Sequence, residues 1–425
     1  MERYNEYKDS GIYFIPDIPK SWQVLKAKYL FKQEKREVRP EDEIVTCFRD
    51  GQVTLRKNRR TEGFTNSMKE IGYQGVRKGD LVIHNMDAFA GAIGVSDSDG
   101  KGTPVYACCT PKRDDINQYY YCYLLRYLAR NGFILSLAKG IRERSTDFRF
   151  NDFKELYLPV PSREEQDAIV SYIDLHSTKI DEAIAQQQKM IDLLNERKQI
   201  IINNAVTKGL NPDAAMKDSG VDWIGEIPEH WEVTMLKKKS QIILGKMLSN
   251  APGSQYEYFC AKDVHYNSAD DTDLKQMNFT DSERQQYQVI KGDMLIVEGG
   301  AGAGGCAIYK GNKTAYIQNS IMIVRGNEDM INEYICYFMQ SINKRGYIEF
   351  ICNKATIPHF TKEKVGAVNI AVPPIEEQKA IIEYINKSCT PIDGAISTAS
   401  NQISFLLERK QIIINDVVTG KVKVC

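Results

Sequence analysis

Three glycines in the second half of the chain have a spacing that can bind phosphate groups. Gly300, Gly302 and Gly305 form G-x-G-x-x-G directly after the apolar run at residues 294–297. In a loop that binds a dinucleotide or S-adenosylmethionine, such glycines precede a helix whose first backbone N–H groups hold the anion. A cofactor-binding enzyme is therefore the first hypothesis to test against the neighbouring sequence.

The residues after these glycines favour a turn over a cofactor loop. Residues 306–309 and 314–317 are typical of strands, and the turn residues 310–312 separate them. No acidic residue that could bind a ribose follows about twenty positions later in a second strand. Glycine also adopts the positive φ angles of a tight hairpin at little cost. We expect a hairpin here, and a cofactor loop is the alternative.

Other residues that could do chemistry do not form an active-site pattern. Residues 372–375 contain two prolines but lack the amide and the aromatic residue that flank them in adenine methyltransferases, and no G-x-x-x-x-G-K-[ST] loop is present. The Asp-Phe-Lys triplet at residues 152–154 resembles the end of a nuclease motif, but chance produces it in a chain with 26% charged residues. Scattered cysteines and histidines predict reduced thiols and no metal site. We predict that the chain is not an enzyme.

Length and composition are typical of a soluble globular protein with two or three domains. The 425 residues are 42% hydrophobic, and the formal net charge is zero. No apolar stretch approaches about eighteen residues and no signal sequence is evident, so we expect a cytoplasmic protein. Residues 1–160 carry 27 Lys and Arg against 22 Asp and Glu, whereas residues 213–372 carry 17 against 20. A net charge of zero still allows a basic face on either domain, because the attraction of a charged ligand depends on the charges near its binding surface.

An internal duplication organises the chain. The sequence EEQ at residues 164–166 recurs at residues 376–378, an offset of 212. At the same offset, ERKQIII at residues 196–202 recurs at residues 408–414. The segments between these anchors align without a gap, which chance does not produce.

Outside these segments the two halves diverge. Residues 8–22 still resemble residues 217–231, and VRKGDLVI at residues 76–83 resembles VIKGDMLIV at residues 289–297. The stretch HNMDAFAGAIGV at residues 84–95 stands in the place of the glycine-rich segment but has lost most of its glycines. A cofactor loop that this fold needed would persist in both copies, so we interpret the glycine-rich segment as a turn.

The duplicated segments are predicted to be helices that pair. Each follows a proline-rich strand end. In the first copy, Ser162 and Glu165 have capping-box spacing. A second N-terminus is expected at Thr178 and Thr390, with Pro391 in the first helical position. Apolar residues then recur at steps of four and three for nearly four heptads, which favours a coiled-coil seam over a helix lying on its own domain. The seam residues are Ile180, Ile184, Ile191, Leu194 and Ile201 in the first copy and Ile392, Ile396, Ile403, Leu406 and Ile413 in the second.

These patterns predict an α+β fold with a pseudo-two-fold internal repeat. Two globular mixed α/β domains are separated by long helices that form an antiparallel coiled coil. The predicted ranges are 1–161 for the first domain, 162–212 for the central helical spacer, 213–373 for the second domain and 374–425 for the C-terminal helical spacer. Antiparallel pairing of homologous helices would place one variable domain at each end of a stiff spacer.

The order of these parts, the endings of the form PxxEEQ…ERKQIIINxxVT and the segment VTKGL at residues 206–210 resemble the specificity subunit of type I restriction–modification enzymes. The resemblance covers essentially the whole chain. It implies two target-recognition domains that each read half of a bipartite site in double-stranded DNA, and helices that set the gap and hold two methyltransferase subunits. It also implies that those partners, and not this chain, bind S-adenosylmethionine, and that restriction/translocase subunits join them. Two reading domains on a stiff spacer would define two half-sites and an unread gap.

Polar residues on predicted loops are the candidates for DNA contact, because one Arg or amide side chain can form two hydrogen bonds to the edge of a single base. For residues 56–60 the alternative is a solvated charged face. Residues 139–148 and 352–360 share a place in both halves, and their alternative is a strand connector. The candidates are Arg56, Lys57, Asn58, Arg59, Arg60, Arg142 and Arg144 in the first domain and Lys246, Lys262, Arg284, Gln285, Gln318, Asn319, Lys354 and Thr356 in the second.

Two other classes of function stay open at this point. The chain could catalyse a reaction by itself, or it could be a coiled-coil scaffold without a DNA function. Methyl transfer by the isolated chain would establish the first, and sequence-selective DNA binding would exclude the second.

Overall fold

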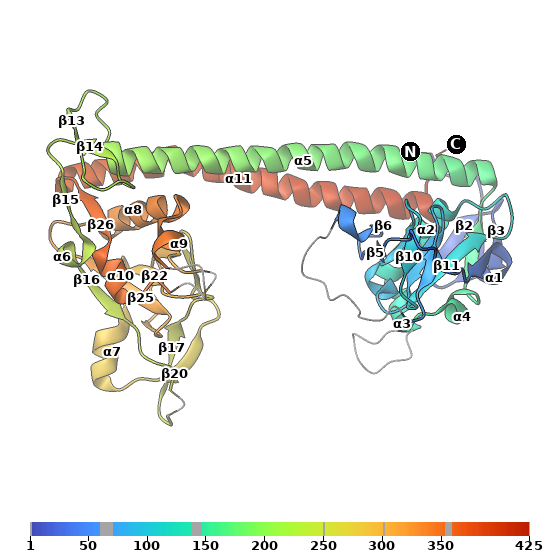
Figure 1. The fold of residues 1–425 in the computed structure, drawn as a ribbon, viewed down its shortest axis with the longest axis horizontal. Helices are drawn as coiled ribbons and strands as arrows, with labels where there is room; N and C mark the ends of the chain where they lie inside the picture. The colour runs from blue at the N-terminus through green and yellow to red at the C-terminus, as the bar shows by residue number, and fades with distance from the viewer. Residues whose placement is uncertain are drawn as a thin grey trace. The chain divides into compact units, whose positions relative to one another are not determined.

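The computed structural model of the chain describes residues 2–59, 71–137, 147–249, 251–300, 302–352 and 359–424 (Figure 1). The chain divides into two compact units. Unit 1 comprises Met1–Gln187 and Asn401–Cys425, and unit 2 comprises Gln188–Ser400. Each unit therefore combines one variable domain with a portion of both long helices. Within the described ranges, no helix is long and apolar enough to cross a membrane.

The variable domain of unit 1 is built on a four-stranded antiparallel sheet with the order β4–β11–β8–β9. Helix α2 (Gln118–Arg130) packs on β8 and β9. The sheet strands are β4 (Phe31–Glu34), β8 (Leu81–His84), β9 (Ile93–Val95) and β11 (Tyr106–Pro111). The paired strands around it are β1 (Tyr7–Ile12) with β2 (Ile15–Pro19), β3 (Gln23–Lys26) with β12 (Tyr157–Val160), β5 (Val45–Cys47) with β6 (Val53–Leu55), and β7 (Gln74–Val76) with β10 (Gly100–Gly102). The short helices are α1 (Ala27–Leu30), η1 (Arg56–Asn58), η2 (Ala88–Ala90), α3 (Phe133–Ser136) and α4 (Phe150–Phe153).

Unit 2 repeats this sheet in the order β16–β25–β22–β23, and helix α8 (Asn332–Lys344) packs on it as α2 does in unit 1. The strands are β16 (Ser240–Leu244), β22 (Met294–Val297), β23 (Cys306–Ile308) and β25 (Ile321–Gly326). A second sheet, of order β20–β17–β24–β21, contains β17 (Gln255–Phe259), β20 (Lys275–Asn278), β21 (Gln288–Val289) and β24 (Ala315–Ile317). The remaining elements are β13 (Met216–Asp218), β14 (Glu226–Pro228), β15 (Glu232–Met235), α6 (Leu236–Lys239), β18 (Val264–His265), β19 (Ser268–Ala269), α7 (Asp281–Tyr287), α9 (Tyr347–Ile351), α10 (Lys362–Ala367) and β26 (Asn369–Val372).

The glycine-rich segment is a hairpin connection, as predicted. It joins β22 to β23, which pair antiparallel, and a strand rather than a helix follows the glycines. Gly300 and Gly304 adopt φ of 85° and 78°. The next strand, β24, pairs with β17 and β21 and not with β23. All three residues of β24 are buried, and a buried strand needs neighbours on both edges to satisfy its backbone.

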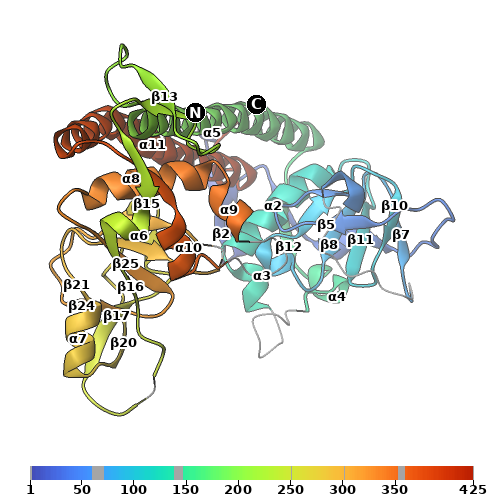
Figure 2. The same ribbon diagram turned by 60° about the vertical axis from the view of Figure 1, so that its left-hand side comes forward.

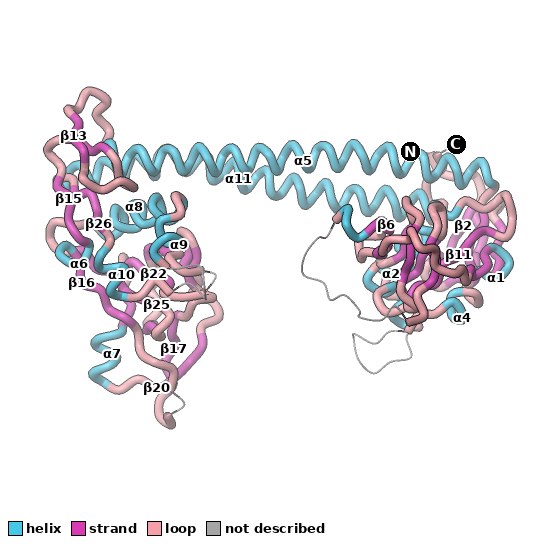
Figure 3. Tube along the Cα trace, in the orientation of Figure 1, coloured by secondary structure: helices cyan, strands magenta, loops and turns pink. Residues whose placement is uncertain are grey.

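The duplicated segments form two uninterrupted helices (Figure 3). Helix α5 (Arg163–Lys208) has 46 residues and helix α11 (Ile375–Val418) has 44. The predicted second N-terminus at Thr178 and Thr390 is therefore wrong. Thr390 Oγ1 donates 2.7 Å to the backbone carbonyl of Asn386, as a threonine inside a helix does, and Pro391 lies within α11. Buried Cys389 and Ile392 flank this proline, and their packing keeps the helix continuous despite one missing N–H donor.

The predicted seam is the buried stripe of both helices. Ile180 and Ile392 are each 8% exposed, and the remaining seam residues are buried or half-buried. Equivalent ion pairs flank the stripe in the two units. Lys410 Nζ lies 2.7 Å from Asp181 in unit 1, and Lys198 Nζ lies 2.6 Å from Asp393 in unit 2.

Each domain is held by the beginning of one long helix and the end of the other, so the two helix segments run antiparallel within each unit. The core of unit 1 includes Ile169 from α5 and Val417 from α11, and Tyr120 Oη donates 3.0 Å to the Val418 carbonyl. In unit 2, Tyr334 on α8 donates 3.2 Å to the Val206 carbonyl of α5. Helix α8 thereby lies between its sheet and the long helices (Figure 2).

Candidate nucleic-acid interface

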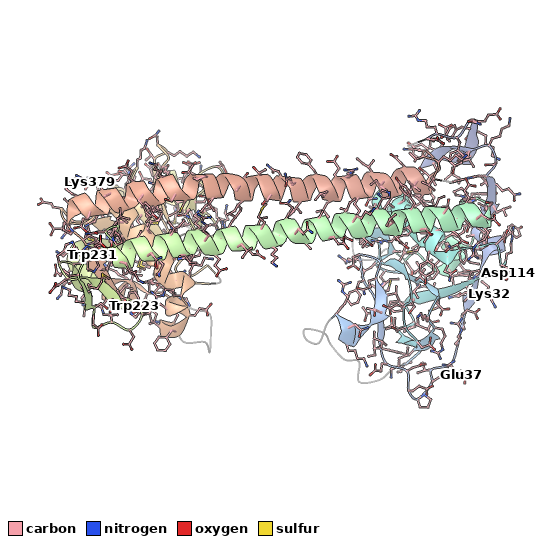
Figure 4. All side chains as sticks on the ribbon, turned by 90° about the horizontal axis from the view of Figure 1, so that it is seen from above. Lys32, Glu37, Asp114, Trp223, Trp231 and Lys379 are labelled. Carbon is pink, nitrogen blue, oxygen red and sulfur yellow. The ribbon has the colours of Figure 1, made fainter. Side chains whose placement is uncertain are left out.

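The repeated EEQ motif attaches each domain to its long helix. The Trp22 indole donates 2.9 Å to Glu165 in unit 1, and the Trp231 indole donates 2.9 Å to Glu377 in unit 2. Trp231 lies beside the end of α5, against Gly209 (Figure 4). The same indole–carboxylate contact therefore fixes the angle at which each domain leaves the helices.

The glutamine of the motif is fully buried in both units. Gln166 and Gln378 each accept one hydrogen bond from a backbone N–H and donate to two backbone carbonyls. The carbonyl acceptors belong to Asp115 and Pro161 in unit 1 and to Asp329 and Pro373 in unit 2. This pattern satisfies strand and loop ends that would otherwise leave buried polar groups unpaired.

The predicted capping box at Ser162 is half present. The Glu165 backbone N–H donates 3.2 Å to Ser162 Oγ, but the Glu165 carboxylate does not return to the Ser162 backbone. It accepts from Trp22 and from Tyr4 instead, at 2.9 and 2.6 Å. The Glu165 carboxylate, which would complete a capping box, instead attaches the domain to the helix.

The repeated KGD sequence is also structural. Asp80 and Asp293 are each 2% exposed, and each accepts from the backbone N–H three residues before it. An arginine from a neighbouring segment neutralises each carboxylate, Arg36 in unit 1 and Arg325 in unit 2. The motif therefore builds a tight turn before the central strand of each sheet.

The candidates at residues 56–59 form the short helix η1 and its end, on the surface of unit 1. All four side chains have partners within their own domain. Arg56 Nε lies 3.3 Å from Thr46 Oγ1, and Asn58 donates 2.9 Å to Thr54 Oγ1. The two remaining cations form exposed ion pairs, Lys57 with Glu43 and Arg59 with Asp50. Exposed pairs of this kind exchange partners at little cost, so a phosphate could replace either carboxylate.

Most candidates of the second domain lie in one region of unit 2. Lys246 pairs with Gln318 in an isolated β-bridge, and the Asn319 backbone N–H donates 2.8 Å to the Lys246 carbonyl. Helix α7, which carries Arg284 and Gln285, borders the same region because Lys246 Nζ lies 2.7 Å from its Glu283. Exposed Gln285 and half-buried Asn319 can approach a ligand, whereas Gln318 is only 8% exposed.

Three of these cations already have partners. Lys246 also donates 2.8 Å to the Asn278 carbonyl and lies over the Phe279 ring, so it supports the fold. Arg284 contacts Asp281 and lies over the Tyr256 ring. Lys262 stands apart, where it donates 2.8 Å to the Asp273 carbonyl. The candidates Arg60, Arg142, Arg144, Lys354 and Thr356 lie outside the described residues.

A cleft in unit 1 was missed by the sequence analysis. It has a volume of about 590 Å³ and lies beside the ends of β4 and β8. Apolar residues line much of it, and its polar lining includes the amides Gln33, Asn85 and Asn151, the cations Lys35 and Arg149, and Asp147, which pairs with Arg149 at 2.6 Å. Amides and cations are the groups that bind base edges and phosphates. These residues come from three separate segments, and no spacing in the sequence links them.

The cysteines within the described ranges are free thiols, mostly buried. Burial raises the pKa of Cys122 to about 11 and that of Cys108 to about 12, so these thiols stay protonated and unreactive near neutral pH. No group of three or more His, Cys, Asp or Glu residues gathers as a metal site in the part of the chain that the structure describes.

The long helices also carry an exposed face that is nearly the same in both copies. We call the following residues the docking face: Leu193, Glu196, Arg197 and Ile200 on α5 in unit 2, and Phe405, Glu408, Arg409 and Ile412 on α11 in unit 1. Their steps of three and four place each set on one side of its helix. The four large apolar side chains are more than half exposed, at 56%, 53%, 67% and 51% for Leu193, Ile200, Phe405 and Ile412.

Comparisons with known proteins agree with this architecture. Residues 228–396 match the family model of the type I restriction modification DNA specificity domain. The putative type I restriction enzyme MjaX specificity subunit of Methanocaldococcus jannaschii is 25% identical over 439 residues, which cover 96% of each chain. The MjaVIII specificity subunit of the same organism is 24% identical over 327 residues, covering 74% of this chain and 72% of the relative.

A solved structure shares the fold. It describes complex assembly and conformational transition of the type I R-M system, and its matching chain has a TM-score of 0.69 at 16% identity, with 95% of this chain and 99% of that chain covered. The family model falls on the second domain, and the first domain repeats its sheet order on the same helical motifs. Residues 228–396 therefore match the type I restriction modification DNA specificity domain, and the whole chain is similar to type I restriction enzyme specificity subunits.

Proposed function

We propose that the chain selects a bipartite DNA site, with each recognition domain contacting one half-site and the long helices setting the unread gap. One observation carries this proposal. The two domains share the order of one four-stranded sheet, the KGD turn and the EEQ attachment, yet the rest of their sequences diverges. Two domains that read different half-sites require a common framework with different surfaces. The framework positions the domain on the DNA, and the surface residues determine which bases are preferred.

The chain supplies recognition and its partners supply chemistry. In this proposal two methyltransferase subunits bind S-adenosylmethionine and methylate the DNA, and restriction/translocase subunits join the assembly. This chain binds no cofactor. A DNA-modifying complex of this kind works in the cytoplasm.

The docking face supports two equivalent partner sites on the helices. Three of its four positions are identical between the copies, namely Glu196 with Glu408, Arg197 with Arg409, and Ile200 with Ile412. These side chains make no ion pair within the described residues and are exposed, so packing inside this chain does not explain their identity. Two copies of one partner that each bind one face would explain it. Exposed apolar side chains rimmed by charges are typical of such contacts.

The test is to express the chain with a methyltransferase subunit encoded beside it and to map methylated adenines by long-read sequencing. We expect a motif of two defined halves separated by a gap of fixed length. The chain alone and the methyltransferase alone should leave the DNA unmodified. An assembled complex that methylates a contiguous motif, or that shows no sequence preference, would contradict the proposal, and the second result would favour a scaffold.

A further inference from the structure

One residue has the same backbone setting in both recognition domains. Asn85 directly follows β8 and Glu298 directly follows β22, at the start of the connection to the next strand of the sheet. Each residue donates its backbone N–H to one carbonyl and accepts at its own carbonyl from one N–H, over 2.9 and 3.0 Å for Asn85 and 2.8 and 2.6 Å for Glu298. The partners are Val105 and Phe148 in unit 1 and Ser320 and Phe360 in unit 2.

This setting fixes the position of the residue in both domains. The carbonyl partner precedes the neighbouring sheet strand, and the N–H partner belongs to the segment that leads back to the long helix. Two backbone hydrogen bonds to separate segments hold the Cα atom more firmly than an open loop does. A residue that reads DNA must be held in this way, because its contacts tolerate only small displacements.

The side chains at this position differ, and the described residues offer them no partner. Asn85 Oδ1 is enclosed and accepts no hydrogen bond from the described residues. The half-buried Glu298 carboxylate makes no hydrogen bond or ion pair within the described ranges, and burial raises its pKa. An acceptor held away from water without a donor costs stability, and such groups are rare in folded proteins. Only the Asn85 acceptor is enclosed, whereas the Glu298 carboxylate is partly exposed, but at both positions a ligand can supply a donor that the described residues do not.

The surroundings of Asn85 suit DNA. The residue lines the 590 Å³ cleft together with Gln33, Lys35 and Arg149. Lys35 is exposed and forms no ion pair with the described residues, so it is free to meet a phosphate. Arg149 in this cleft pairs with Asp147, whereas Lys35 at its edge and the Asn85 amide have no partner among the described residues, so these two groups can meet a phosphate and a base edge of a duplex.

We propose that Asn85 and Glu298 are equivalent base-reading residues, each setting the preferred base at one position of the half-site read by its own domain. This inference rests on the proposed function. An asparagine offers one donor and one acceptor and matches the N6 and N7 edge of adenine, whereas a glutamate only accepts and matches the amino group of cytosine. The two domains thereby read different bases from one shared position.

The glycine-rich segment serves this position. It begins directly after Glu298 and returns the chain to β23 close to helix α9. Gly304 adopts φ of 78°, and a Cβ atom there would lie 2.2 Å from Ile348 Cδ1, so a larger residue would strain the backbone and displace the Ile348 side chain. Gly304 therefore lets this connection pass close to α9.

The test uses the full chain assembled with its methyltransferase partner, and the readout is the methylation motif. Asn85→Asp keeps the shape of the side chain and removes its donor, and Glu298→Gln keeps the shape and adds one. We expect each variant to lose about 5- to 150-fold of the base preference at one position of one half-site, the range expected for one paired base contact. The other half-site should stay unchanged and serves as the internal reference.

Matched controls separate base reading from a general effect of the same chemical change. Asn131→Asp alters an exposed amide at the end of α2 in unit 1, and Glu349→Gln alters an exposed acid on α9 in unit 2. Both controls should leave the motif unchanged. If Asn85→Asp does not assemble, Glu298→Gln decides the question alone, because it removes a half-buried charge and keeps the side-chain shape.

The outcomes distinguish this inference from the function it rests on. A wild-type complex without a bipartite motif would overturn the proposed function. A bipartite wild-type motif that neither variant changes, or that both variants weaken equally in both halves, would overturn only the assignment of Asn85 and Glu298. A change confined to one position of the matching half-site supports it.

Discussion

At the scale of single residues, the repeated side chains build the framework and the variable ones are left for recognition. Gln166 and Asp80 recur as Gln378 and Asp293, and all four are buried with their hydrogen bonds satisfied inside their own unit. Asn85 has no chemical equivalent in the second domain, where Glu298 takes its place. A candidate chosen by charge alone can be a framework residue or a recognition residue, and Lys246 is a framework residue.

The buried glutamine gives a direct stability prediction. Gln166→Ala leaves one backbone N–H and two carbonyls without partners inside unit 1, so we expect a loss of about 2–5 kcal/mol in the free energy of unfolding. Denaturant unfolding of the purified chain measures it. Glu164→Ala, at an exposed position of the same motif, should change stability by less than about 0.5 kcal/mol. Equal effects of the two substitutions would contradict the assigned role.

The Lys246–Glu283 pair predicts a pH dependence. Its hydrogen bond with Lys246, followed by the Thr280 backbone N–H, lowers the pKa of Glu283 below its ordinary value of 4.5. A carboxyl group whose pKa falls on folding contributes stability that is present above about pH 4.5 and is lost as the pH falls through the lower, folded value. Glu283→Gln should therefore be less stable than wild type at pH 7 and indistinguishable from it in strong acid. A difference that persists at low pH would point to packing instead of charge.

At the scale of elements, each long helix has two functional faces. The inner seam joins the helices and their domains, and the apolar side chains of the outer docking face are more than half exposed. Ile412 and Ile413 are adjacent on α11, yet the first is 51% exposed and the second is 6% exposed. This pair allows the two faces to be tested one residue apart.

We expect Ile413→Asp to destabilise unit 1 by about 3–5 kcal/mol, because it buries an unpaired charge in the seam. Ile412→Asp should leave the unfolding free energy nearly unchanged and weaken association with the methyltransferase subunit. Denaturant unfolding and analytical ultracentrifugation of the mixed subunits measure the two effects. Full partner binding by Ile412→Asp, alone and combined with Ile200→Asp, would show that the docking face is not the contact.

At the scale of the whole molecule, each compact unit is made from both halves of the sequence. Unit 1 needs the end of α11 and unit 2 needs the end of α5. Neither half of the sequence therefore contains a complete unit. Exchange of a recognition domain is still feasible, because the hydrogen bonds that attach it to the helices recur in both units.

Replacing residues 213–373 with the corresponding domain of a relative should change one half-site and preserve the other. The donor domain must bring an indole to Glu377, backbone partners to Gln378 and a tyrosine to the Val206 carbonyl, since these contacts attach the native domain. Methylation mapping gives the result. Simultaneous loss of both half-sites by a chimera that still assembles would contradict independent reading.

Helix length should set the unread gap. Inserting four helical residues between Lys189 and Met190, together with four between Asn401 and Gln402, keeps the Asp181–Lys410 and Lys198–Asp393 pairs in register. Four residues lengthen a helix by about 6 Å, close to the rise of two base pairs at about 3.4 Å each. We expect the same two half-sites with a gap longer by one or two base pairs. Insertion in α5 alone, after Asn195, shifts Lys198 away from Asp393 and should impair assembly. An unchanged gap in the double insertion would refute this role for the helices.

The sequence by itself determined the duplication, the coiled-coil seam and the hairpin at the glycines. These features depend on local spacing, since heptad periodicity marks one face of a helix wherever it packs. The predicted seam from Ile180 to Ile201 and from Ile392 to Ile413 is the buried stripe that the structure shows. The family resemblance also followed from motifs that are continuous in the sequence.

Only the tertiary structure decided where the helices begin, what the EEQ motif does and which residue is held for recognition. Thr178 and Thr390 have the chemistry of helix caps, but packing of the residues around them carries the helix through both positions. Asn85 and Glu298 follow ordinary strands, and their shared setting depends on hydrogen bonds to Phe148 and Phe360, more than sixty residues away in each case. Contacts at such separation leave no periodicity in the sequence, because they arise only when distant segments fold against one another.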